Sequence, residues 1–159
     1  VPSLLPSPEQ RKYIYERIRH FRKTKDIFSM DFQNDAEYVG GCIAGGRRYL
    51  HINAAGDVEP CVFIHYSNVN IHKSSLLDAL KSPLFMAYHN EQPFNQNMLR
   101  PCPMLENPDC LQNMVNKTGA VSTDLQSPES VEHLCDKCRP YADNWKETAN
   151  ALWYKHCIN

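Results

Sequence analysis

The sequence predicts an α+β fold in which a β-hairpin is followed by several helices. Three observations carry this prediction. The chain opens on a stretch with helical signals, RRYLHINAAGDVEPCVFI reads as two strands around a turn, and helical periodicity dominates after residue 74. A length of 159 residues suits one domain of ordinary size.

Residues 7–25 are expected to form the first helix. Ser7 is the candidate N-cap and Pro8 suits the first helical position. An apolar stripe recurs at helical spacing: Ile14, Ile18 and Phe21. The other positions are strongly basic, Arg11 included. We interpret them as a solvated face and not as a nucleic-acid surface, because the net charge of the whole chain is −1.

DIFSMDF, residues 26–32, alternates like a strand directly after this helix. A helix followed at once by a strand is typical of the end of an α/β unit. This unit has no further strands with which to build a sheet, so we expect the chain to be a piece of a longer protein. Residues 28–32 would then expose an unpaired strand edge, through which a homodimer is predicted.

The hairpin turns at Gly56 and Asp57, and Pro60 should lie at an edge or a bulge because it lacks an N–H. SSLLDALKSPLFMAYHN predicts one helix, or two short helices that meet at Pro83. An irregular proline-rich stretch follows, then a helix from Asn107 to about Lys117. The last helical run begins near Ser127, and Pro140 should kink or split it. Its apolar residues are Val131, Leu134, Cys138, Tyr141, Trp145, Ala149 and Leu152.

Seven cysteines are many for this length. Their odd number and the absence of a recognisable secretion signal argue against a disulfide framework and favour a reducing compartment, the cytoplasm. Thiolates that bind metal fit better. Cys42 precedes the first strand of the hairpin and Cys61 lies on the second, so both thiols are expected near the base of the hairpin.

The other candidate ligands differ in their settings. Cys102 lies between two prolines, which favours a ligand over an inert thiol. Cys110 lies near a helix start, where the helix dipole favours a thiolate. Cys135 and Cys138 form a CxxC pair inside an amphipathic helix; Cys138 is expected in the core and Cys135 is left open. His65 follows the second strand, close in sequence to Cys61.

GGCIAGGRRYLHINAAGDVEPCVF, NVNI, SLLDALKSPLF and RPCP together resemble the C-terminal auxiliary-cluster region of radical S-adenosylmethionine enzymes, called SPASM in its full form and twitch in its shortened form. The resemblance implies a cysteine, a gap, a glycine, four residues and a second cysteine on a hairpin. Cys42, Gly56 and Cys61 fit that pattern.

The resemblance implies two domains, a barrel remnant over residues 1–34 and an auxiliary-cluster domain over residues 35–159. The catalytic CxxxCxxC motif does not occur in this sequence. The catalytic cluster and S-adenosylmethionine are therefore expected in a barrel core outside this chain, which alone would not be catalytic. The parent would be a radical SAM oxidoreductase or maturase.

The string of cysteines that follows the hairpin in a full SPASM domain does not occur either, so a single auxiliary [4Fe-4S] cluster is implied. Its ligands would be Cys42, Cys61 and Cys102, with Cys110, Cys135, His65 or no residue as the fourth.

The expected role of this cluster is electron transfer or substrate binding. The implied partners are the chain's own barrel and a peptide or small-molecule substrate, with no nucleic acid and no membrane. Two alternatives stay open from the sequence. One is a structural zinc domain, since Zn²⁺ accepts four sulfur ligands, and the other is a protein-interaction domain without metal.

Overall fold

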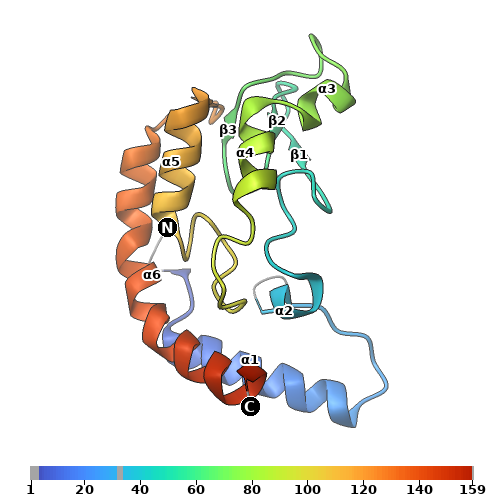
Figure 1. Ribbon diagram of the computed structural model, residues 1–159, viewed down its shortest axis with the longest axis vertical. Helices are drawn as coiled ribbons and strands as arrows, with labels where there is room; N and C mark the ends of the chain where they lie inside the picture. The colour runs from blue at the N-terminus through green and yellow to red at the C-terminus, as the bar shows by residue number, and fades with distance from the viewer. Residues whose placement is uncertain (1–3, 32–33, 159) are drawn as a thin grey trace.

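The computed structural model of the protein describes residues 4–31 and 34–158. Helices and small antiparallel sheets make it up, which confirms the α+β prediction (Figure 1). In chain order the elements are α1 (Pro8–Thr24), α2 (Ala36–Val39), β1 (His51–Ile52), β2 (Val58–Glu59), β3 (Tyr66–Ser67), α3 (Leu76–Leu80), α4 (Pro83–Glu91), α5 (Pro108–Thr118), β4 (Val121–Ser122) and α6 (Val131–Trp153), with a π-helical segment Tyr154–Ile158 after α6.

Helix α1 begins where the sequence predicts. The Ser7 hydroxyl accepts the Gln10 N–H at 3.3 Å, and the Gln10 side chain accepts the Ser7 N–H at 2.8 Å, which completes a capping box. The predicted stripe is wrong, because Ile14 and Phe21 are exposed. The helix instead buries Pro8, Arg11 and Tyr15. Arg11 tolerates burial because a buried carboxylate and an aromatic ring receive its guanidinium, as described below.

The predicted strand over residues 26–32 is also wrong for residues 26–31; residues 32 and 33 lie outside the described residues. Ile27, Phe28 and Met30 are all strongly exposed. A strand exists only by pairing its backbone with a neighbour, and no strand pairs with this segment in the described part of the chain. The strand edge that was expected to mediate a homodimer is therefore not formed by these residues.

The predicted β-hairpin is confirmed, although its strands are short. Strands β1 and β2 pair antiparallel, with His51 opposite Glu59 and Ile52 opposite Val58. Gly56 in the turn has a φ of 88°, a value open to glycine. Strands β3 and β4 form a second antiparallel pair. The hairpin thus returns the chain to Pro60, whose carbonyl accepts the Gly45 N–H.

The helices after the hairpin follow the prediction with two changes. α3 and α4 are two helices that meet just before Pro83, and α5 ends at Gly119 in the left-handed conformation. α6 begins at Ser130, not at Ser127, because the Ser130 hydroxyl accepts the His133 N–H. α6 also runs unbroken through Pro140, and Figure 1 shows it curved.

Helix α6 is the longest helix of the described chain, and α1 and α5 pack on it. α5 lies along its first half and α1 along its second half (Figure 1). Where α1 packs against α6, one cluster of side chains is buried: Tyr15, Leu99, Trp145, Ala149 and Leu152. The larger core joins the hairpin to α4, α5 and α6. Among the described helices, none combines the length and apolar character that a membrane crossing requires.

Two glycines in left-handed conformations provide a matched test of this packing. A Cβ on Gly45 would lie 2.6 Å from the fully buried Tyr88 side chain, whereas a Cβ on Gly119 would meet nothing within 4 Å. We expect Gly119→Ala to lower the free energy of unfolding by about 1 kcal/mol, for the positive φ alone. Gly45→Ala should lower it by roughly 2–4 kcal/mol, since overpacking adds to that strain. Urea unfolding measures both, and equal losses would show that the contact with Tyr88 is unimportant.

Candidate metal centre

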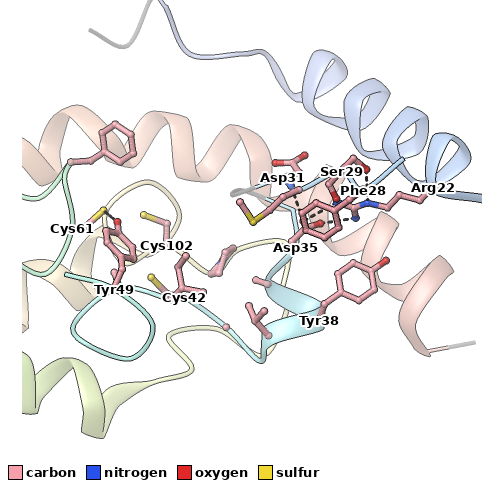
Figure 2. A pocket seen from close by; sticks show the side chains of 18 of the residues that line it. Arg22, Phe28, Ser29, Asp31, Asp35, Tyr38, Cys42, Tyr49, Cys61 and Cys102 are labelled. Atoms are coloured by element: carbon pink, nitrogen blue, oxygen red, sulfur yellow. Dashed lines mark hydrogen bonds and ion pairs between the residues drawn. The ribbon is translucent and has the colours of Figure 1, made fainter. Parts of the chain in front are cut away.

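Three cysteines line one cavity of about 510 Å³. They are Cys42, Cys61 and Cys102, which come from three separate segments of the chain (Figure 2). Figure 2 shows their sulfur atoms grouped at one end of the cavity, beside Tyr49. Cys61 is buried, and the other two are partly exposed. The fold therefore brings together the three thiols that the sequence analysis selected as ligands.

The hairpin and the glycine-rich loop before it are joined at the site. The Gly45 N–H donates to the Pro60 carbonyl at 2.9 Å, so the loop that carries Cys42 lies against the residue next to Cys61. Gly45 can make this approach because it has no side chain to collide with Tyr88. This contact is the local reason that Cys42 and Cys61 reach the same cavity.

Cys102 is held by an irregular but well-anchored loop. Leu99 is fully buried, and its carbonyl accepts the Trp145 indole N–H at 2.9 Å. The Cys102 N–H donates to the Glu106 carboxylate at 2.7 Å. The Leu105 N–H points at the Cys102 sulfur, 3.4 Å away. Backbone N–H groups directed at a sulfur are suited to stabilising a thiolate.

Burial favours the protonated form of two of the cavity's thiols, Cys42 and Cys102. Burial raises the pKa of Cys42 to about 11, and the neighbouring Cys61 raises it further. Burial also raises the pKa of Cys102 well above its ordinary value, with contributions from Glu106 and Cys42. Cys42 thus interacts electrostatically with Cys61 and with Cys102. A metal that binds here would displace the thiol protons.

Tyr49 contributes a hydroxyl to the same end of the cavity. Its oxygen lies 2.6 Å from the Cys61 sulfur. Burial raises the pKa of Tyr49 above its ordinary value, and its contact with Cys61 adds to this effect. The phenol therefore stays protonated at neutral pH and can donate to a sulfur ligand.

The other candidate ligands do not line this cavity. Cys110 lies on the first turn of α5, and the Cys135 thiol donates to the Pro108 carbonyl at 3.2 Å. Cys138 is buried in the core face of α6, as predicted. His65 turns its Nδ1 to the two carboxylate oxygens of Glu59, each 3.3 Å away.

The opposite end of the cavity combines apolar and charged side chains. Phe28 and Tyr38 lie there and are largely exposed (Figure 2). Arg22 forms two hydrogen bonds to Asp35 at the same end, at 2.7 and 2.8 Å. The cavity thus joins a sulfur-rich end to a mouth in which exposed aromatic rings stand beside an ion pair.

The shared cavity offers a thiol donor set. Among the residues that the structure describes, no group of three His, Cys, Asp or Glu side chains is placed to hold a single metal ion. Cys42, Cys61 and Cys102 nevertheless line one volume. Cysteine thiolates are the ligands of iron–sulfur clusters, and they also bind zinc.

Sequence reasoning missed three residues at this site: Arg11, Tyr49 and Glu106. Arg11 was assigned to the solvated face of the first helix, yet it is 4% exposed. Its spacing of four residues from the buried Tyr15 was the available signal. Glu106 lies in a stretch without periodicity, and its burial depends on a partner 95 residues away. No local pattern reveals such a pairing.

The buried thiols predict how the stability of the metal-free chain depends on pH. Burial raises the pKa of Cys42 to about 11 and that of Cys135 to about 12, whereas thiols in an unfolded chain ionise near about 8.5. The unfolded state therefore loses its protons first. Stability is complete below about pH 8.5 and should fall as the pH rises towards about 11.

Urea unfolding over this pH range measures the fall, and the Cys42→Ser variant should show a shallower one because serine does not titrate. A free energy of unfolding that stays constant or rises with pH would contradict the assignment of buried, protonated thiols.

Comparison with known families agrees with the geometry of the site. The family model SPASM, described as an iron–sulfur cluster-binding domain, matches residues 42–111. No curated protein and no solved structure matches the chain. The match begins at Cys42 and includes Cys61 and Cys102. Residues 42–111 are therefore similar to a SPASM iron–sulfur cluster-binding domain, which is consistent with the resemblance that the sequence showed.

Proposed function

We propose that this chain binds one auxiliary [4Fe-4S] cluster through Cys42, Cys61 and Cys102, as part of a radical S-adenosylmethionine enzyme. One observation supports the proposal above all: these three thiols line one cavity. All three also lie within residues 42–111, which the family model matches. The partner is the catalytic barrel, which supplies S-adenosylmethionine and the catalytic cluster. Free thiols at every described cysteine suit a reducing compartment such as the cytoplasm.

When bound, the cluster would supply one-electron transfer or an iron that coordinates substrate. The chain's own residues position the three thiols. The loop at Gly45 and the hairpin bring two thiols together, and the 99–106 loop presents the third with the Leu105 N–H directed at its sulfur. Burial around Cys42 and Cys102 lowers the local dielectric, which strengthens the effect of each nearby charge and dipole.

The fourth iron is proposed to have no cysteine or histidine ligand from the described chain. Among the cavity-lining residues, the only cysteines are the three named, and no histidine lines it. Cys110, Cys135 and His65 are turned to other partners or lie on other surfaces. An iron without a protein ligand would be open to coordination by substrate, whether a peptide or a small molecule. The open end of the cavity, beside Phe28 and Tyr38, would admit that substrate.

Cysteine substitutions test the ligand set after anaerobic reconstitution with iron and sulfide. We expect Cys42→Ala, Cys61→Ala and Cys102→Ala each to lose most of the bound iron and the absorbance near about 400 nm, because a cluster requires thiolate ligands. Cys110→Ala and Cys135→Ala serve as matched controls and should retain both. The measurements are iron, acid-labile sulfide and visible absorbance per chain.

Two outcomes would sink this proposal. One is a reconstituted parent chain that retains zinc and takes up no sulfide. The other is a Cys42→Ala or Cys61→Ala variant with unchanged absorbance. Loss of the cluster in Cys110→Ala, with α-helical circular dichroism intact, would instead identify Cys110 as the fourth ligand.

A further inference from the structure

A buried ion pair lies directly behind the Cys102 ligand. Arg11 of α1 and Glu106 of the 99–106 loop are 2.8 Å apart, and their side chains are 4% and 0% exposed. The Arg11 guanidinium also stands over the Trp145 ring, 4.0 Å from its centroid. Helix α1 is thereby connected to the loop that carries Cys102.

Glu106 uses its two carboxylate oxygens for different tasks. One oxygen accepts the Arg11 guanidinium, and the other accepts the Cys102 N–H at 2.7 Å. The backbone carbonyl of Glu106 also accepts the Arg100 guanidinium at 3.0 Å. The carboxylate therefore fixes the backbone of a cysteine ligand and places a negative charge beside it, and Arg11 balances that charge.

Stability alone is a weak reason for such a pair. Removing two charges from water costs more than a typical buried pair returns, and apolar replacements of similar volume are often neutral or stabilising. Arg11 Nη1 also has no hydrogen-bond partner among the described residues. The pair does contact the backbone of Cys102, a proposed ligand. We therefore look for its effect at the metal centre and not in the stability of the fold.

We propose that the Arg11–Glu106 pair positions Cys102 and sets the charge beside the cluster, so that it controls the reduction potential. The inference rests on the proposed function and concerns neither a ligand nor the reaction itself. A negative charge close to a cluster disfavours the electron that reduction adds, and a positive charge favours it. The two members of the pair therefore act in opposite directions.

Charge-changing variants of the reconstituted chain provide the test, by redox titration at one mildly alkaline pH. Glu106→Gln keeps an acceptor for the Cys102 N–H but removes the negative charge. It should raise the ratio of reduced to oxidised cluster about tenfold at a fixed potential, or about 59 mV for one electron. Arg11→Met should lower that ratio. The double variant restores neutrality and should return the ratio towards that of the parent chain.

Controls separate charge from packing. Arg11→Lys keeps the charge and should keep the parent potential. Arg139→Met removes a cation from the more exposed α5–α6 pair with Asp109 and should not move the potential. The electrostatic part of the proposal is overturned if the two single variants shift the potential in the same direction, or if neither shifts it.

Alkylation of Cys102 in the metal-free chain tests the positioning part without a cluster. Glu106→Ala removes the acceptor of the Cys102 N–H and should speed alkylation of Cys102, whereas Glu106→Gln should not; mass spectrometry measures both rates. Equal rates in the two variants overturn the positioning role. A parent chain that takes up no iron and sulfide overturns the proposed function itself, whereas a loaded parent with unmoved potentials overturns only the role of the ion pair.

Discussion

The hydrogen bond from the Gly45 N–H to the Pro60 carbonyl holds together the two segments that carry Cys42 and Cys61. It depends on a loop that passes close to Tyr88, which only a glycine allows. Without this contact the hairpin would still form, because its own backbone bonds define it. The sulfur-rich end of the cavity would lose its present form, since the loop supplies Cys42 and the hairpin supplies Cys61.

Two buried carboxylates support the remaining parts of the site. Glu59 lies two residues before Cys61 and accepts His51 at 2.7 Å and the Thr123 hydroxyl at 2.5 Å, which joins the hairpin to the segment after β4. Glu106 accepts the Cys102 N–H and the Arg11 guanidinium, which joins the Cys102 loop to α1. Each carboxylate is fully buried yet fully partnered, as a polar group in a protein interior must be. The segments that carry Cys61 and Cys102 are therefore held by side chains from other parts of the chain.

The cavity changes character from one end to the other. Its inner end contains sulfur, a tyrosine hydroxyl and directed backbone N–H groups, whereas its mouth is lined by exposed aromatic and aliphatic side chains. Exposed apolar groups that border a cavity are typical of a surface that meets a ligand or another domain. This arrangement explains why Ile27, Phe28 and Met30 are apolar without belonging to a strand: their side chains line the cavity, and no strand of the described residues pairs with their backbone.

The sequence by itself determined the α+β class, the hairpin, the limits of α1 and α5 and the choice of Cys42, Cys61 and Cys102. These features depend on local signals such as caps, turns and the spacing of cysteines around Gly56. Only the tertiary structure decided that Ile14 is exposed while Arg11 is buried. It also decided that the His65 imidazole contacts the Glu59 carboxylate and does not line the cavity. The physical reason is that the burial of a charge or the orientation of an imidazole depends on a partner elsewhere in the chain. Arg11 and Glu106 are 95 positions apart, beyond the reach of any periodic pattern.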